Sequence, residues 1–216
     1  MKRKIVIFGA GGHGRGTLEI LRARRAAGFE TPEPIGFVDD ACQEAHRGPL
    51  PVLGTSTWIE EHAGEGFALI LAIADPKTKK ALDERFNPLG IAWASAVHPS
   101  AILGGGCQLE EGTIIGAGVV VNYDTVIGRH TTINLNATVG HDCVIGDYVT
   151  VAPGVNITGG VHLGEGALVQ TNATVLPGIE LGAFSHVGPG SVVLRSVGEG
   201  EFHFGNPARR MPKAGV

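Results

Sequence analysis

The second half of the chain carries an aliphatic residue at every sixth position. Stepping by six from Val97 to Val193 gives seventeen aliphatic residues without interruption. The residue two positions before each of them is nearly always small or β-branched, as at Ala101, Cys107 and Thr113. Two inward side chains that flank one outward side chain make a short strand, and the glycines that often follow the aliphatic residue allow a tight corner. A period of six therefore predicts a stacked β-solenoid.

The first half alternates between apolar runs and stretches of mixed polarity. We expect strands at 4–8, 35–38 and 68–74, and helices at about 17–27 and 76–86. Strands that alternate with helices are typical of a parallel βαβ sheet. Asp75 and Pro76 suit the N-cap and first turn of the second helix. Because the hexads begin near Ser95, we predict a small Rossmann-like α/β domain at 1–95 and a β-helix domain with a C-terminal tail at 96–216.

The composition narrows the classes of function. The chain of 216 residues has 34 glycines, 43% hydrophobic residues and a net charge of −4, which favours a globular protein with many tight bends and gives no reason to expect nucleic acid as a partner. Three cysteines without C-x-x-C spacing indicate neither a disulfide framework nor a structural zinc site, and we expect no metal. The apolar runs are too short for a signal peptide or a membrane span, so we expect a cytoplasmic protein without a membrane partner.

A glycine-rich motif follows the first predicted strand. The segment Gly9-Ala10-Gly11-Gly12-His13-Gly14 matches G-x-G-x-x-G, a pattern that binds phosphate at the N-terminus of a helix. A dinucleotide needs two mononucleotide-binding halves, and about 95 residues are too few for both, so the motif favours a nucleotide-sugar. A purely structural glycine turn stays open as an alternative. Asp39 and Asp40 end the second predicted strand, where carboxylates often bind ribose hydroxyls, or they are exposed acids.

One histidine differs in its setting from the others of the repeat. His141 follows Gly140 and is followed directly by Asp142. An imidazole suits proton removal near neutral pH, and a carboxylate on its other nitrogen would fix the tautomer. Neighbouring residues of a strand point to opposite faces, so the pair requires a corner. The repeat places Cys143 inward, which makes a cysteine nucleophile unfavourable.

Five motifs together resemble a known family. The segments GAGGHG, FVDD, HPSA, VGHDCVIGD and GNPARR occur in this order along the chain. They resemble the sugar acyltransferases that join a small nucleotide-binding domain to a left-handed β-helix of hexapeptide repeats, a family that includes nucleotide-linked amino-sugar N-acetyltransferases and sialic acid O-acetyltransferases. The resemblance implies a homotrimer with active sites at the subunit interfaces and acetyl-CoA as co-substrate.

The resemblance also implies roles for individual residues. It makes His141 the general base and Asp142 the acid that raises its basicity. The residues that it places on the nucleotide-sugar are Gly12, His13, Gly14, Asp39 and Asp40. The residues that it places on acetyl-CoA are Thr150, Gly159, Thr171 and Pro189. Gly159 lies one coil beyond His141, Thr171 and Pro189 are expected to continue the same wall, and Thr150 replaces a second histidine that relatives often carry.

The implied function is acetylation of the 4-amino group of a nucleotide-linked amino-dideoxy sugar, such as a GDP-perosamine-like acceptor, by direct attack on the thioester. Its implied setting is surface polysaccharide biosynthesis, such as that of the lipopolysaccharide O-antigen. Three alternatives stay open: O-acetylation of a sialic acid or similar sugar hydroxyl, a metal-dependent hydratase with histidine ligands, and a nucleotide-sugar-binding scaffold without activity. The sequence does not choose between GDP and UDP.

Overall fold

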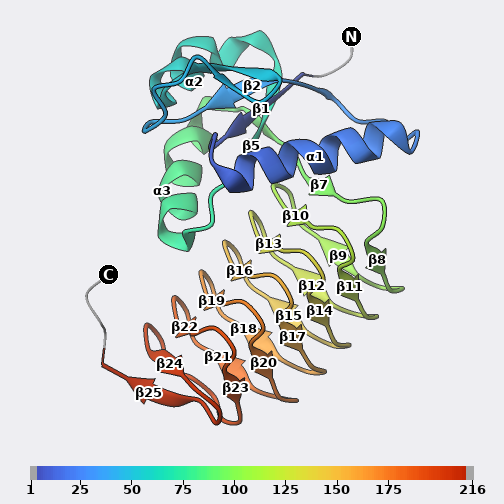
Figure 1. Cartoon of the computed structure of the whole chain (residues 1–216), viewed down its shortest axis with the longest axis vertical. Coiled ribbons are helices and arrows are strands. Elements are labelled where there is room, and N and C mark those ends of the chain that lie inside the picture. Colours follow the sequence, from blue (N-terminus) through green and yellow to red (C-terminus); the bar gives the residue numbers. More distant parts are fainter. Residues whose placement is uncertain (1–3, 213–216) are drawn as a thin grey trace.

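The computed structural model describes residues 4–212 and consists of an α/β domain followed by a parallel β-helix (Figure 1). The α/β domain has one six-stranded sheet in the order β3-β4-β2-β1-β5-β6. Its strands are β1 (Lys4–Phe8), β2 (Glu33–Val38), β3 (His46–Arg47), β4 (Leu50–Gly54), β5 (Phe67–Leu71) and β6 (Ala92–Trp93). All neighbours are parallel except the β3/β4 hairpin. The predicted parallel sheet is confirmed.

Three helices complete this domain: α1 (Gly12–Ala26), α2 (Ser56–His62) and α3 (Pro76–Phe86), with two short 3-10 turns at Ala63–Glu65 and Asn87–Leu89. The predicted N-cap of α3 is confirmed, because Asp75 Oδ2 accepts a hydrogen bond of 2.8 Å from the backbone N–H of Thr78. The prediction that the first helix starts at Thr17 is wrong by more than one turn. Since α1 begins at Gly12, part of the glycine motif is itself helical.

The β-helix has three sheets, which we number in the order in which the chain enters them. The first contains β7 (Ala96–Val97), β10 (Ile114–Ile115), β13 (Thr132–Ile133), β16 (Thr150–Val151), β19 (Leu168–Val169) and β22 (His186–Val187). The second contains β8 (Ile102–Leu103), β11 (Val120–Val121), β14 (Thr138–Val139), β17 (Asn156–Ile157), β20 (Thr174–Val175) and β23 (Val192–Val193). The third contains β9 (Gln108–Leu109), β12 (Val126–Ile127), β15 (Val144–Ile145), β18 (His162–Leu163) and β21 (Glu180–Leu181).

Each strand pairs with the strand one coil later. Ile115 lies beside Ile133, and Val139 lies beside Ile157, so one coil is 18 residues long. We call the bends from the first to the second sheet, from the second to the third and from the third to the first the first, second and third corners. The aliphatic residues of the repeat fill the interior, where Ile133, Val151 and Leu163 are fully buried. The predicted hexad pattern thus sets the core.

Two different slots of the hexad shape the corners. Directly after the aliphatic residue the coils approach closely: a Cβ on Gly140 would lie 2.5 Å from the backbone nitrogen of Gly159. Two positions later, every sixth residue from Gly106 to Gly190 has a left-handed backbone. This residue is a glycine or one of Asp124, His130, Asn136, Asp142, Tyr148, Asn172 and Phe184. Glycine, asparagine and aspartate adopt this conformation most readily.

The two domains share a core. Ala96 and Ile114 of the first β-helix sheet pack with Leu18 and Leu21 of α1, and Arg24 donates 2.9 Å to the carbonyl of Val97. In Figure 1, α1 crosses above β7 and β10, and α3 descends beside the first coils. At the other end, β24 (Phe202–Phe204) continues the first sheet and pairs with antiparallel β25 (Arg209–Met211). The α/β domain therefore covers the first sheet and adjoins the first and third corners.

Candidate functional site

His141 and Asp142 form a close pair at the second corner. Nδ1 of His141 lies 2.6 Å from Oδ2 of Asp142, and the two side chains are 48% and 62% exposed. The contact between neighbouring residues is possible because Asp142 has a φ of 56°, which turns its side chain toward the imidazole. With Nδ1 held by the carboxylate, Nε2 is the nitrogen left for chemistry.

The surroundings of His141 hold its ring in place. Tyr123, one coil earlier, stacks on the imidazole with 5.3 Å between the ring centres. One coil later, Gly159 lies directly against the ring, since an added Cβ would be 2.6 Å from Nε2. The N–H of Gly160 donates 2.8 Å to the carbonyl of His141, which fixes the spacing of the two coils. The Nε2 atom of His141 therefore lies against the backbone of Gly159.

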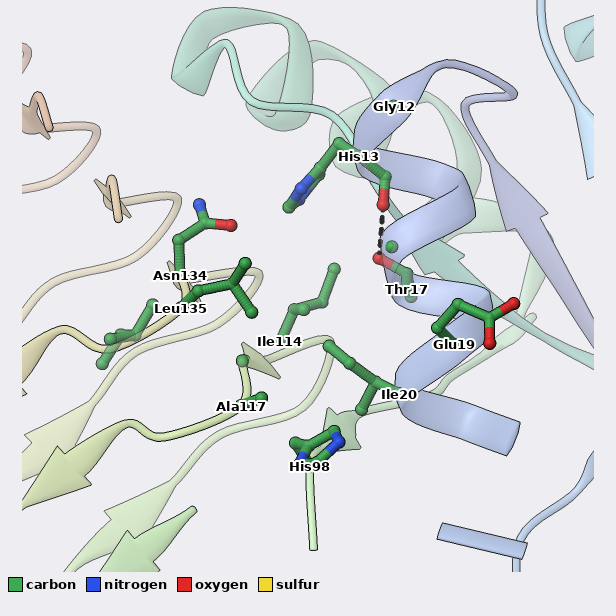
Figure 2. Close-up of a pocket in the computed structure, with 13 residues that line it drawn as sticks. Gly12, His13, Thr17, Glu19, Ile20, His98, Ile114, Ala117, Asn134 and Leu135 are labelled. Atoms are coloured by element: carbon green, nitrogen blue, oxygen red, sulfur yellow. Dashed lines mark hydrogen bonds between the residues drawn. The ribbon is translucent and has the colours of Figure 1, made fainter. Parts of the chain in front are cut away.

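A pocket of about 480 Å³ lies elsewhere, between α1 and the first corner (Figure 2). Figure 2 shows His13 projecting from the start of α1 toward Asn134, with Ile20 and His98 farther along the cleft. Burial, and then the charge of Lys79, lower the pKa of His13 to about 4. The pocket therefore combines a largely apolar wall with a neutral imidazole and an amide. The residues that line it are Gly12, His13, Gly16, Thr17, Glu19, Ile20, His98, Ile114, Gly116, Ala117, Ile133, Asn134 and Leu135.

Of the five residues expected on a nucleotide-sugar, the structure places Gly12 and His13 in this pocket. Gly14 is buried, and its lack of a side chain allows close packing against the glycine turn, because a Cβ there would lie 1.8 Å from the carbonyl oxygen of Gly9. Asp39 accepts backbone hydrogen bonds from Ala10, Ala41 and Cys42, and Asp40 accepts one from Ser56. Asp39 thus ties the glycine turn to the end of β2, while Asp40 holds the first N–H of α2.

The expectation that Thr171 and Pro189 continue the wall of Gly159 is wrong. They lie 12 and 30 residues beyond Gly159, and neither interval is a multiple of the 18-residue coil. Both residues follow strands of the first sheet and belong to the first corner, in the column of Leu135. A ligand along the second corner of one chain therefore meets Gly159 but not these two residues.

Thr150 also does not lie on the exposed surface. Its side chain is buried, its hydroxyl donates 2.8 Å to the carbonyl of Ala74, and it accepts 2.9 Å from Lys79 Nζ. These contacts join α3 to the β-helix. The structure thus corrects the expectation that Thr150 contacts the acyl donor, because its side chain is buried and its hydroxyl is bonded to Lys79 and Ala74.

Cys143 is confirmed as an inward residue. Its side chain is fully buried, its Sγ donates 3.1 Å to the carbonyl of Thr158, and burial raises the pKa of the thiol. A buried thiol with a raised pKa is a poor nucleophile. Over residues 4–212 no cluster of three or more His, Cys, Asp or Glu side chains is arranged to hold a metal. No helix within the same range is long and apolar enough to cross a bilayer.

Several residues of the pocket were not predicted as site residues from the sequence. Asn134, Leu135 and His98 follow the aliphatic residues of their hexads at the first corner, as ordinary corner residues do. The available signal was the 18-residue column, which separates residues of the first corner from those of the second. Asn134 precedes His141 by only seven residues, yet the two belong to different corners.

Two family models match the chain. The PglD N-terminal domain matches residues 4–86, and the bacterial transferase hexapeptide (six repeats) matches residues 124–159. These matches fall on the two domains of the structure.

Relatives match along both domains. A GDP-perosamine N-acetyltransferase from Escherichia coli O157:H7 is 32% identical over 170 residues, which cover 76% of each chain. The solved H141N mutant of perosamine N-acetyltransferase from Caulobacter crescentus, in complex with CoA and GDP-perosamine, is 33% identical with a TM-score of 0.90 and 97% of each chain covered. The acetyltransferase domain of PglB from Neisseria gonorrhoeae FA1090, in complex with acetyl coenzyme A, is 27% identical with a TM-score of 0.89, over 98% of this chain and 100% of that one.

These solved relatives are left-handed β-helix acetyltransferases, and their likeness over nearly the whole chain confirms the predicted fold class, including the hand of the helix. The chain belongs to the family of hexapeptide-repeat nucleotide-sugar N-acetyltransferases that includes GDP-perosamine N-acetyltransferase.

Proposed function

We propose that the chain transfers the acetyl group of acetyl-CoA to the 4-amino group of a GDP-linked amino-dideoxy sugar. The observation that carries this proposal is the His141–Asp142 pair at an open corner, with the free Nε2 above Gly159. Relatives whose names specify perosamine N-acetyltransferase, with CoA and GDP-perosamine bound, support the choice of an amine acceptor over a sugar hydroxyl.

In this mechanism His141 is the general base. The sugar nitrogen attacks the carbonyl carbon of the thioester, and Nε2 takes the proton that the nitrogen loses as the C–N bond forms. Asp142 stabilises the imidazolium through Nδ1. The tetrahedral intermediate then collapses with cleavage of the C–S bond, and the proton of His141 passes to the leaving thiolate. No acyl-enzyme forms.

A backbone N–H beside His141 is suited to stabilise the oxyanion. Among the backbone hydrogen bonds of residues 4–212, the carbonyl of Gly159 accepts from Gly178, but its N–H donates to no partner. A free donor next to the reacting group contributes most where negative charge develops, and loss of one such donor typically costs about 10²–10³ in kcat. We assign the N–H of Gly159 to this role.

The acceptor sugar fits the pocket between α1 and the first corner. This pocket faces a different side of the prism from His141, because the strand β14 separates the first corner from the second. The pocket of one copy is therefore completed by His141 of another copy. In such an assembly Thr171 and Pro189 of one copy would face Gly159 of the next, which restores them to the acetyl-CoA site.

Exposed apolar side chains support an assembly of this kind. Ile102 and Val120 project from the second sheet and are 62% and 39% exposed, and Val144 projects from the third sheet. Neither sheet is packed against the α/β domain, which covers the first sheet. Exposed apolar side chains gathered on one side of a chain are typical of a subunit interface. Three copies related by a threefold axis along the β-helix bury all of these surfaces equally.

The test is release of free CoA thiol from acetyl-CoA with a panel of acceptors: GDP- and UDP-linked 4-amino-4,6-dideoxy sugars and free sialic acid. We expect turnover with the GDP-linked amino sugar and none with sialic acid. Turnover with sialic acid alone would replace the proposal by O-acetylation, and no turnover with any acceptor would contradict acyl transfer to a sugar. An amino sugar made in this way suits a cell-surface polysaccharide.

A further inference from the structure

Tyr123 is a half-exposed aromatic residue that the proposed mechanism does not use. It occupies the same slot of the second corner as His141, because the two residues are one 18-residue coil apart. Its ring stacks on the imidazole with an angle of 13° between the ring planes. Since Tyr123 remains 48% exposed, burial of its ring contributes little to folding. The stack on His141 therefore needs an explanation other than core packing.

The backbone of Tyr123 is held from two sides. Its carbonyl accepts 3.2 Å from the N–H of Asp142, and its own N–H donates 2.9 Å to Oδ1 of Asn122. On the preceding coil, Gly104 lies so close that an added Cβ would be 2.6 Å from the backbone nitrogen of Tyr123. Tyr123 therefore contacts both members of the pair: its carbonyl binds the backbone of Asp142, and its ring packs on the side chain of His141.

The imidazole of His141 is enclosed on both faces. Tyr123 lies one coil before it and Gly159 one coil after it, so they contact opposite faces of the ring. A Cβ on Gly159 would lie 2.6, 2.8 and 3.1 Å from Nε2, Cε1 and Cδ2, which places it over the face of the ring rather than at its edge. The lone pair of an imidazole nitrogen lies in the plane of the ring. A substrate N–H therefore reaches Nε2 edge-on, in that plane.

The contact with Asp142 alone does not fix this plane. A single hydrogen bond at Nδ1 lets the imidazole tilt and move Nε2 out of line with the substrate. Gly159 blocks the tilt toward the later coil, and Tyr123 blocks the tilt toward the earlier coil. A general base must lie within hydrogen-bond reach of the proton that it removes, so a fixed ring favours the transfer. The aromatic face also attracts the charge that the imidazole gains with the proton, because cations within about 6 Å of a ring centre are stabilised.

A second stack of this kind occurs at the third corner. His130 and Tyr148 are also 18 residues apart, with 5.8 Å between the ring centres and an angle of 6° between the planes. Tyr148 is only 8% exposed, and its hydroxyl donates 2.5 Å to Asp83, so that stack belongs to the packing between the domains. The ring of Tyr123 is exposed instead, and its contribution falls on the orientation of His141.

We propose that Tyr123 is a positioning residue for the reaction: its ring holds the imidazole of His141 so that Nε2 meets the acceptor nitrogen in the plane of the ring, and it stabilises the imidazolium that forms. The proposal rests on the proposed function for the role of His141 as the base. The stack itself exists without any substrate, so the stack and the acetyl transfer can fail separately.

The first measurement is NMR of the full-length protein with ¹³C-labelled histidine rings, with His141→Asn to assign the signal. A stacked aromatic ring shields the protons above its face, so we expect the Cε1 and Cδ2 protons of His141 to resonate upfield. Tyr123→Leu should move them downfield, whereas Tyr123→Phe should leave them nearly in place. Equal shifts of His141 in the unsubstituted protein and in Tyr123→Leu would overturn the proposal.

The second measurement is steady-state thiol release with acetyl-CoA and a GDP-linked 4-amino sugar. In Tyr123→Leu we expect kcat to fall about 3- to 10-fold, the size typical of one lost aromatic stack, with unchanged KM for both substrates. Tyr123→Phe should retain kcat, because it keeps the ring and loses only the hydroxyl. The proposal fails if kcat is unchanged in Tyr123→Leu, if only KM changes, or if Tyr123→Phe is as slow as Tyr123→Leu.

Phe29→Leu is the matched control. Phe29 lies just beyond the end of α1 and is 51% exposed, so this variant also loses an exposed aromatic ring, but one that does not contact His141. Its kcat should equal that of the unsubstituted protein. A loss as large as that of Tyr123→Leu would show that the effect is not specific to the stack.

The double variant Tyr123→Leu/His141→Asn shows whether Tyr123 acts through the imidazole. Without the base the ring has nothing to position, so we expect the double variant to be no slower than His141→Asn. A further loss as large as that in Tyr123→Leu alone would mean that Tyr123 acts on the substrate directly, and would overturn the proposal. Absence of turnover by the unsubstituted protein with every acceptor contradicts the proposed function, whereas the NMR shifts of His141 still test the stack.

Discussion

Two corners of the β-helix carry the same chemical pair in opposite environments. At the third corner, His130 lies 3.3 Å from the carboxylate of Asp83, its side chain is fully buried under α3, and burial lowers the pKa of the imidazole to about 4. At the second corner, His141 lies 2.6 Å from Asp142, and nearly half of its side chain is exposed. The backbone is left-handed at both corners, at His130 and at Asp142.

The difference follows from which corners the α/β domain covers. Where α3 covers the coil, the imidazole packs edge-on against Trp93 and face-to-face with Tyr148, and the pair holds the domains together. At the second corner no other segment within residues 4–212 covers the coil, and the pair is exposed to solvent. A histidine–carboxylate pair at a corner of the β-helix is therefore not by itself evidence of catalysis, and its exposure decides between the two roles.

The substitution with the largest expected effect is His141→Asn. Loss of a general base typically lowers kcat/KM by about 10²–10⁴, and the fold should persist because the side chain is exposed. Steady-state thiol release measures the effect. His162→Asn, on the outer face of β18, is the control and should retain full activity. Near-normal turnover by His141→Asn would show that the proton has another acceptor.

Gly159→Ala tests the same corner from the neighbouring coil. A Cβ 2.6 Å from Nε2 must push the imidazole aside, and a misplacement of about 1 Å can lower the rate by about 10². Gly105→Ala is the matched control, because Gly105 occupies the same slot three coils earlier and an added Cβ meets nothing within 4 Å. Equal turnover by both variants would mean that the Gly159 contact is not needed.

His130→Asn tests the covered corner through stability. A folded-state pKa of about 4 against about 6.5 in the unfolded chain means that the unfolded state binds the extra proton between these values, so stability falls as pH drops through this window. The contribution is on the order of 3 kcal/mol. Asparagine tolerates the left-handed backbone, as at Asn136 and Asn172. Urea unfolding at several pH values should show a shallower acid decline in the variant, and an unchanged decline would contradict the assignment.

Cys143→Ala should have the smallest effect. The substitution removes one buried sulfur from the core, so we expect a loss of about 1 kcal/mol in unfolding free energy and unchanged kcat. Thermal unfolding and thiol release measure the two quantities. A large loss of kcat in a folded variant would indicate an acyl-cysteine intermediate.

The repeat was predictable because one physical rule acts on every coil. Each aliphatic position must fill the same interior, so a period of six predicted the strands of a solenoid and the inward side of Cys143, whereas the 18-residue coil was implied by the resemblance to the family. The N-cap at Asp75 was predictable for a similar reason, since the helix N-terminus leaves backbone donors that a carboxylate satisfies.

The features of the fold and of the site that were not predicted depend on contacts between distant segments. The sequence did not predict α2 or the β3/β4 hairpin, whose strands are short and lack a clear period. Thr171 and Pro189 were assigned to the wrong corner because six-residue periodicity alone does not distinguish three corners. The burial of Lys79 was not predictable, because a lysine on a helix of mixed polarity normally faces water.

The most direct test of a site shared between copies is complementation of two inactive variants. His141→Asn removes the base, and Gly16→Phe fills the pocket, where a side chain added at Gly16 meets no protein atom within 4 Å of its Cβ. The two are coexpressed with different tags, and mixed assemblies are purified by both tags before thiol release is measured. If each site takes its pocket from one copy and His141 from another, about one third of the sites in the doubly tagged mixed trimers are intact, and activity returns well above that of either parent. Mixed assemblies no more active than the parents would place the pocket and the base of each site on one chain and contradict the account.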